Sequence, residues 1–140
     1  MCTKLGFDND SELIQLLGMD KFYGIYTRNY LEHVFAKNYE DINYYTLIVD
    51  FDGVGKMNKK LGYGGTNHLF RMMFKNFMFD DPKIIMGRWF SGDEIALISL
   101  DNNLDKLSVK FAKHCKNYGL KFKILILTSE KIDKIFGGLL

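Results

Sequence analysis

The residues best suited to chemistry are acids at two interruptions of the apolar pattern. Asp50 and Asp52 end the most hydrophobic segment of the chain, and Asp93 and Glu94 follow a Ser-Gly pair between two other apolar segments. A carboxylate at the end of an apolar strand is costly unless water, a hydrogen bond or a cation satisfies it. If the two interruptions meet in the fold, their oxygens match the ligands that Mg²⁺ prefers, and such a site is suited to phosphoryl transfer.

A turn that contains two glycines follows the first pair of acids. Glycines in Gly53-Val54-Gly55 let the backbone approach a ligand closely, and a predicted helix begins there with N–H groups that attract an anion. Phosphate binding is one interpretation of this segment, and a plain turn that ends the strand is the other. Asp52 likewise either binds a metal or hydrogen-bonds within the turn.

Helices and strands are interleaved in the order that must position these residues: helices, a strand, two helices, a hairpin of two strands, a helix and a last strand. Apolar spacing predicts helices over 11–17, 28–37, 56–61, 67–78 and 103–119, and strands over 44–51, 83–90, 94–100 and 121–128. The turn LGYGGTN separates two of the helices, with Thr66 as the candidate N-cap of the second. Ser91-Gly92-Asp93 is typical of a hairpin turn. This order favours an α+β sandwich, in which helices cover one face of an antiparallel sheet.

Length and composition are those of one globular domain. The chain has 140 residues, of which 47% are hydrophobic and 26% charged, and no Gly/Ser linker or repeat divides it. We therefore expect a single domain over 1–140, with 1–19 as an N-terminal helical extension.

Charge and apolar patterning exclude several classes of partner. The net charge of +2 lacks the basic excess of a dedicated nucleic-acid-binding protein, whereas one nucleoside triphosphate needs only a local anion site. No apolar run is long enough to cross a membrane, and acidic residues come too early for a secretory signal. Cys2 and Cys115 lack metal-ligand spacing. We expect a cytoplasmic protein that binds neither nucleic acid nor membrane.

Three segments together resemble the GGDEF family of diguanylate cyclase domains. DKFYGIYTR at 20–28 is similar to the family's D-x-L-T-G-L-x-N-R. DFDGVGKMNKKLGYGGTN at 50–67 is similar to D-x-D-x-F-K-x-x-N-D followed by G-H-x-x-G-D, and SGDEI at 91–95 resembles the family signature. The three segments occur in the family's order, and the resemblance covers roughly residues 20–129.

The resemblance implies a ferredoxin-like fold, like that of the polymerase palm, and an enzyme that condenses two GTP molecules into cyclic di-GMP. Two domains would form a transient homodimer, in which each presents one nucleotide to the other. It also implies that Asp50, Asp93 and the backbone carbonyl of Phe51 hold Mg²⁺ or Mn²⁺. Glu94 would support the metal site or the deprotonation of the 3′-hydroxyl.

The resemblance also assigns the nucleotide-binding residues. Backbone amides of Gly53, Val54 and Gly55 would bind the β- and γ-phosphates, and Asn58 and Asn67 would face the base. Asn67 replaces the family's guanine-reading aspartate. A carboxylate accepts both N–H donors of guanine, whereas an amide offers one acceptor and one donor, which suits adenine better. Relaxed or altered base choice is therefore expected.

Other positions depart from the family pattern. Gly55 replaces the family's phosphate-binding lysine, and Arg88 lies one residue further from the signature acid than the family's arginine does. The signature begins with serine and ends with isoleucine, and the chain ends at GGLL without the family's closing helix, which carries further phosphate-binding residues.

Two alternatives to a diguanylate cyclase remain. A degenerate GGDEF domain would bind a nucleotide or a partner without turnover, which Gly55, Asn67 and the missing closing helix favour. A palm-type cyclase of the minimal CRISPR polymerase kind would make a different cyclic nucleotide, for example from ATP, which Asn67 and the short chain favour. The retained acids and Asn58 favour activity.

Overall fold

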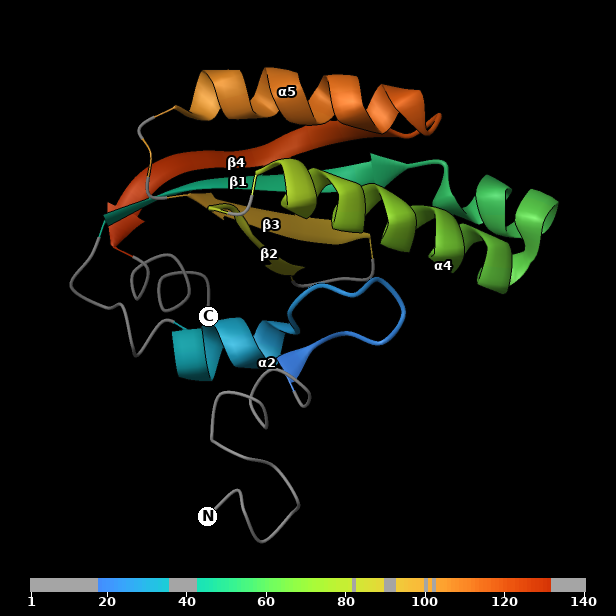
Figure 1. Cartoon of the computed structure of the whole chain (residues 1–140), viewed down its shortest axis with the longest axis horizontal. Coiled ribbons are helices and arrows are strands. Elements are labelled where there is room, and N and C mark those ends of the chain that lie inside the picture. The colour runs from blue at the N-terminus through green and yellow to red at the C-terminus, as the bar shows by residue number, and fades with distance from the viewer. Residues whose placement is uncertain are drawn as a thin grey trace, which may run out of the picture.

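A four-stranded antiparallel sheet organises the molecule, and helices lie on both of its faces (Figure 1). The computed structural model describes residues 18–35, 43–81, 83–89, 93–99, 101 and 103–131. The predicted helix over 11–17 and nearly all of the predicted extension over 1–19 lie outside these residues. So do Ser91 and Gly92 of the predicted hairpin turn.

The described strands are interleaved with helices along the chain. In chain order they are α2 (Arg28–Tyr30), the π-helical η2 (Leu31–Phe35), β1 (Asn43–Asp52), α4 (Val54–Asp80), β2 (Ile85–Arg88), β3 (Glu94–Ser99), α5 (Leu104–Asn117) and β4 (Lys121–Lys131). The strands lie in the order β2-β3-β1-β4, and every neighbouring pair is antiparallel. From β1 onward this is the β-α-β-β-α-β unit of a ferredoxin-like sandwich. The predicted α+β fold is confirmed.

The main core lies between the sheet and the helices α4 and α5. Side chains of alternate residues in β1, among them Leu47, Val49 and Phe51, are buried in it, as the period of two in a strand requires. The Phe51 ring contacts four others at centroid distances of 5.0 to 6.2 Å: Phe70, Phe74, Phe111 and Phe122. Because Phe51 lies between Asp50 and Asp52, this packing fixes the end of β1 that carries the acids.

The segment 18–35 covers the opposite face of the sheet. It contributes Leu31 to a second buried cluster, whose other members come from β1, from β3 and from the residue directly after β2: Tyr44, Ile48, Trp89, Ala96 and Ile98. The Tyr26 N–H donates to the Met86 carbonyl at 3.0 Å, and the Arg88 N–H donates to the Tyr26 carbonyl at 2.8 Å. The prediction of helices on one face only was therefore wrong. Central strands that are apolar on both faces need a second covering layer.

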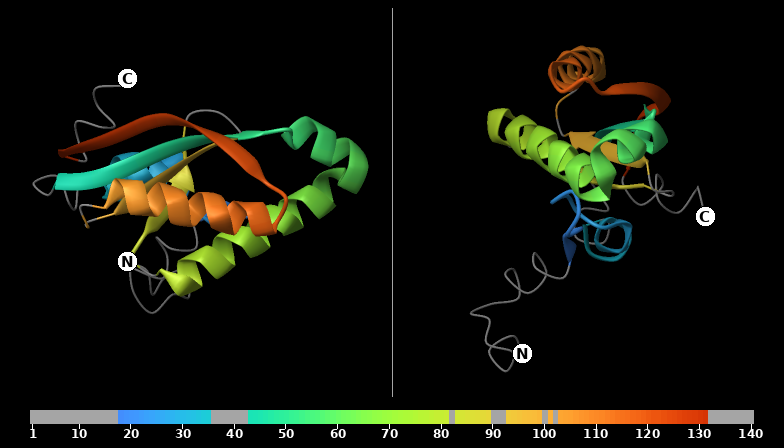
Figure 2. Two further views of the ribbon diagram at one scale, coloured as in Figure 1. Left: turned by 90° about the horizontal axis from the view of Figure 1, so that it is seen from above. Right: turned by 90° about the vertical axis from the view of Figure 1, so that its right-hand side faces the viewer.

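The region predicted as two helices with a turn between them forms two helical segments that meet at a sharp kink within α4. Only Gly62, with a φ of +73°, leaves helical geometry inside α4, and Figure 2 shows the resulting bend. Glycine adopts this positive φ at little cost, so one helical segment ends there and the next begins directly after it. Thr66 lies inside the helix, is buried, and has no hydrogen-bond partner for its hydroxyl among the described residues. The prediction of Thr66 as an N-cap was wrong.

The amphipathic helix predicted over 103–119 is present as α5. Leu107, Phe111 and Cys115 are buried against the sheet, and Gly119, with a φ of +70°, lets the chain reverse into β4. Burial raises the pKa of the Cys115 thiol to about 12, so this thiol stays protonated at neutral pH. None of the helices in the described ranges is both long and apolar enough to cross a membrane.

Substitution of Gly87 tests how the segment 18–35 packs on β2. A Cβ at this buried position would overlap the Leu31 side chain and lie 3.2 Å from the Tyr26 carbonyl oxygen. We predict that Gly87→Ala lowers the free energy of unfolding by about 1–3 kcal/mol, measured by urea denaturation. The control is Gly64→Ala in α4, where an added Cβ meets no atom within 4 Å. The control should keep or raise stability, and equal stability of the two variants would contradict the packing described.

Candidate functional site

The acids predicted to share a metal ion meet at one end of the sheet. The ladder of β1 and β3 pairs Asp50 directly with Glu94, and the Phe51 N–H donates to the Asp93 carbonyl oxygen at 3.1 Å. The C-terminal end of β1 thus lies beside the N-terminal end of β3. The pairing therefore brings the two acidic segments of the chain side by side.

The charge of Asp50 reaches Asp93. The pKa of Asp93 is raised above its usual value, first because the side chain is partly buried and second because of the negative charge of Asp50. The positive charge of Arg88 acts in the opposite direction. A cation bound near Asp50 and Asp93 would therefore relieve the repulsion between their two carboxylates.

Asp50 also has a lysine on its other side. Lys123 of β4 lies directly opposite Asp50 in the β1–β4 ladder, and its Nζ atom lies 3.8 Å from Asp50 Oδ2. This lysine was not among the predicted site residues, because only the register between the strands places it there. The sequence carries one hint, since Lys121 and Lys123 alternate with an apolar residue at the start of the last strand.

Gly53-Val54-Gly55 lies where it was predicted, between the end of β1 and the first turn of α4. Gly53 precedes the helix with a φ of +74°, and no side chain caps the helix start. A Cβ at Gly53 or Gly55 would meet no atom within 4 Å, so the surroundings of this turn are open. Val54, in contrast, is buried and anchors the turn in the core. Uncapped N–H groups at an open helix start can bind an anion.

Asn58 and Asn67, the two residues predicted to face a base, lie on either side of the kink in α4. Both side chains are half-buried. In the described part of the chain, no hydrogen bond occupies either side-chain amide. Their donors and acceptors therefore remain for a ligand.

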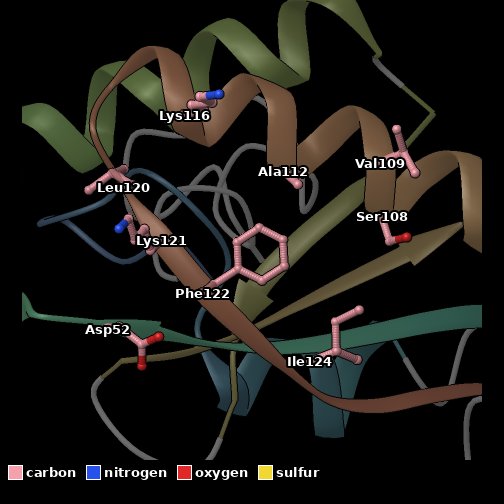
Figure 3. Close-up of a pocket in the computed structure, with 9 residues that line it drawn as sticks. All are labelled: Asp52, Ser108, Val109, Ala112, Lys116, Leu120, Lys121, Phe122 and Ile124. Carbon is pink, nitrogen blue, oxygen red and sulfur yellow. The ribbon is translucent and has the colours of Figure 1, made fainter.

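Asp52 lines a pocket between α5 and β4 (Figure 3). The pocket has a volume of about 750 Å³ and a mostly apolar lining that includes Val109, Leu120 and Phe122. Lys121 lies near Asp52 at one end of it. Asp52 thus contributes to this pocket, whereas Asp50 contributes to the acid pair.

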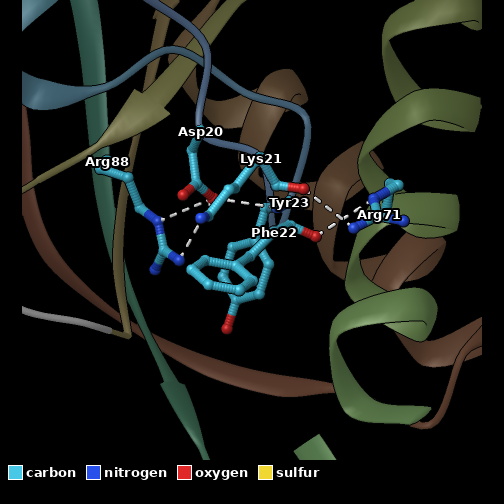
Figure 4. Close-up of polar contacts among 6 residues, drawn as sticks. All are labelled: Asp20, Lys21, Phe22, Tyr23, Arg71 and Arg88. Carbon is cyan, nitrogen blue, oxygen red and sulfur yellow. Dashed lines mark hydrogen bonds and ion pairs between the residues drawn. The ribbon is translucent and has the colours of Figure 1, made fainter. Parts of the chain in front are cut away.

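A polar cluster supports the Asp93 side of the site (Figure 4). The Arg88 guanidinium forms an ion pair with Asp20, with Nη2 3.3 Å from Oδ2, and lies 3.9 Å from the centroid of the Tyr23 ring. Asp20 also accepts a hydrogen bond from the Tyr23 N–H at 2.9 Å. The Arg88 charge also lowers the pKa of Asp93, so the displacement of Arg88 along the sequence has not removed its charge from the neighbourhood of that acid.

Arg71 of α4 holds the same loop from the other side. Its Nε and Nη2 atoms donate to the carbonyl oxygens of Phe22, at 3.2 Å, and Lys21, at 2.9 Å (Figure 4). The pKa of Tyr23 is raised, chiefly because burial disfavours the phenolate. The loop that carries Tyr23 therefore contacts both α4, through Arg71, and β2, through Arg88.

The carboxylates at this site fit Mg²⁺ better than Zn²⁺. Within the described ranges, no three His, Cys, Asp or Glu side chains form a group that could hold a metal ion. Zinc in a structural site takes four protein ligands, so these residues do not fit it. Mg²⁺ is commonly held by one or two carboxylates together with waters and substrate phosphates, which fits Asp50 and Asp93.

Substitution of Asp93 tests the repulsion between the two acids. Because the pKa of Asp93 is raised in the folded state, ionisation of this carboxyl disfavours folding, and its contribution to stability falls as pH rises through the unfolded and folded pKa values. We predict that Asp93→Asn raises the free energy of unfolding at neutral pH in the presence of a chelator, by less than about 1 kcal/mol because solvent screens charges that are only partly buried. Well below the usual aspartate pKa of 3.8 the difference should vanish.

Urea denaturation at both pH values measures this effect. Asp52→Asn is the control, because it removes an exposed acid from the same end of β1 but leaves the acid pair intact. A decrease in stability of Asp93→Asn at neutral pH, or an equal gain in the control, would contradict the prediction.

The fold is similar to that of GGDEF domains in solved structures. A microbial GGDEF domain studied with bis-(3′,5′)-cyclic di-GMP has a TM-score of 0.63 at 13% identity, covering 80% of this chain and 76% of that one. The diguanylate cyclase SiaD of Pseudomonas aeruginosa, solved with its activator SiaC, has a TM-score of 0.60 at 14% identity. The match covers 91% of this chain and 53% of SiaD. A diguanylate cyclase/phosphodiesterase from Caldicellulosiruptor saccharolyticus has a TM-score of 0.59 at 14% identity, and the match covers 88% of this chain and 81% of that one.

No family model and no curated protein matches the sequence. Identities of 12 to 15% establish likeness of fold, and the chemistry has to be inferred from the residues themselves. The fold of this chain is that of the GGDEF domain, as its three motif segments predicted.

Proposed function

We propose that the chain is a GGDEF-type nucleotidyltransferase that joins two nucleoside triphosphates, GTP in the first instance, into a cyclic dinucleotide such as cyclic di-GMP. The observation that carries this proposal is the meeting of Asp50 with Asp93 and Glu94, directly before the open, uncapped start of α4. Carboxylates for a metal ion and open amides for phosphates are the two parts that phosphoryl transfer needs.

The acids have distinct roles in this proposal. Asp50, Asp93 and the carbonyl oxygen of Phe51 would hold Mg²⁺ or Mn²⁺. Such an ion, when bound, would supply positive charge for the phosphates and favour ionisation of the attacking 3′-hydroxyl. Glu94 would support the metal ligands or accept the hydroxyl proton, and its position opposite Asp50 is compatible with either role.

The nucleotide would extend from these acids along the start of α4. Amides of Gly53, Val54 and Gly55 would bind the β- and γ-phosphates, because a helix start without a capping side chain leaves such donors open. Asn58 and Asn67 would bind the base. The complex of a similar GGDEF domain with cyclic di-GMP supports a nucleotide ligand.

Two copies would have to act together. One acid pair binds one nucleotide, whereas the product contains two, so we propose a transient homodimer in which each copy presents its nucleotide to the other. We place the activity in the cytoplasm, where nucleoside triphosphates are available.

Product analysis tests the proposed reaction. We expect incubation with Mg²⁺ and each nucleoside triphosphate, singly and in mixtures, to yield a cyclic dinucleotide detectable by mass spectrometry. Asp93→Ala should lower turnover at least about 100-fold, because the metal loses a ligand, while Asp52→Ala should retain turnover. Circular dichroism checks that both variants fold. A wild-type chain that binds metal and nucleotide but yields no product would instead support the degenerate domain, which Gly55 also favours.

Asn67 favours a second candidate within the same reaction class, a cyclase that uses ATP. Its amide offers one donor and one acceptor, which matches adenine better than guanine. We predict that Asn67→Asp shifts the ratio of kcat/KM for GTP to that for ATP at least about tenfold toward GTP, since one such base contact contributes about 1–3 kcal/mol. Competition assays with both nucleotides measure this ratio. Strict use of GTP by the wild-type chain would refute the ATP candidate.

A further inference from the structure

Lys123 joins the candidate site from a strand on which no site residue was predicted. It lies directly opposite Asp50, and directly opposite residues of an antiparallel pair project from the same face of the sheet. Its ammonium lies 3.8 Å from the Asp50 carboxylate, and its side chain remains 62% exposed. The lysine is thus close to a proposed metal ligand and still free to change its orientation.

The proposed site needs positive charge beyond one metal ion. It contains Asp50, Asp93 and Glu94, and a bound triphosphate would add several negative charges that a divalent ion only partly neutralises. Arg88 is already engaged by Asp20 and the Tyr23 ring. Gly55, at the start of α4, carries no charge of its own.

We propose that Lys123 is the cation that binds the triphosphate in this site, an inference that rests on the proposed function. Without a ligand its ammonium neutralises part of the charge of Asp50. With Asp50 holding Mg²⁺, the ammonium would turn to the phosphates of the bound nucleotide. A lysine is suited to this exchange, because its charge is compact and its four-carbon stem is flexible.

Two other lysines near the end of β1 fit this role less well. Lys121 lies opposite Asp52 in the ladder and lines the pocket below α5, and it makes no ion pair within the described ranges (Figure 3). Lys56, in the first turn of α4, is exposed and likewise pairs with none of the acids that the structure describes. Lys123 is the lysine that the structure pairs with a site carboxylate.

Binding of two probes tests the proposal without relying on turnover or on the choice of base. Inorganic tripolyphosphate with Mg²⁺, followed by calorimetry, reports the phosphate site, and Mn²⁺ alone, followed by electron paramagnetic resonance, reports the acids. We expect Lys123→Gln to weaken tripolyphosphate binding at least about tenfold, the scale of one lost charge-assisted hydrogen bond. Its affinity for Mn²⁺ should be unchanged or higher, because no ammonium competes for Asp50.

The matched control is Lys121→Gln, which removes the same charge two residues away on the same strand. It should leave both affinities within about twofold, and Lys123→Arg should keep most of the tripolyphosphate affinity. Thermal unfolding checks that each variant folds. Equal losses in Lys121→Gln and Lys123→Gln, or a parallel loss of Mn²⁺ affinity in Lys123→Gln, would overturn the assignment.

The wild-type chain separates failure of this inference from failure of the proposed function. If wild type binds both probes and Lys123→Gln binds them equally well, Lys123 is not the phosphate-binding cation, and the proposed function stands. If wild type binds neither probe, the proposed function falls, and this inference falls with it.

Discussion

The antiparallel pairing of β1 with β3 is the constraint on which the site depends, because it forces like charges together. Asp50 stands directly opposite Glu94 in this ladder. Like charges in such positions cost a few tenths to about 1 kcal/mol. The same ladder buries Leu47, Ile48 and Val49 completely, and each fully buried side chain of this kind contributes about 1.5–3 kcal/mol. The apolar part of the ladder therefore overcomes the repulsion at its end and holds the acids in a fixed relation.

The order of the strands places the acids of the site at the centre of the sheet and the neighbouring cations at its two edges. The acids are on or next to the two central strands, with Asp50 on β1 and Glu94 on β3, whereas the cations beside them come from the two edge strands, Arg88 from β2 and Lys123 from β4. Arg88 is held by Asp20 and by the Tyr23 ring, so its charge is fixed in place. Lys123 has a single described ion pair and remains largely exposed. One edge thus supplies a fixed positive charge and the other an adjustable one.

Local sequence patterns predicted the parts of the fold and the site that local physics determines. Acids after an apolar strand, glycines before a helix and an amphipathic α5 were all recognisable, because each follows from neighbouring residues. The break at Gly62 was predicted from the glycine-rich stretch around it, although helical geometry resumes directly after Gly62 and not after the whole LGYGGTN segment. The placement of Lys123 beside Asp50 depends on the register of two strands that are about 70 residues apart, which no local pattern contains.

A sequence motif specifies positions along the chain, whereas phosphate binding depends on where charges lie in the folded structure. Gly55 lacks the charge that a lysine would provide, and taken alone this favours a domain that has lost its activity. The start of α4 nevertheless keeps its open amides, and β4 brings a lysine within 3.8 Å of Asp50. A cation on a neighbouring strand satisfies the same electrostatic need as one on the helix, provided that its ammonium can reach the phosphates. Loss of a charged residue from a motif is therefore weak grounds for inactivity until the neighbouring strands have been considered.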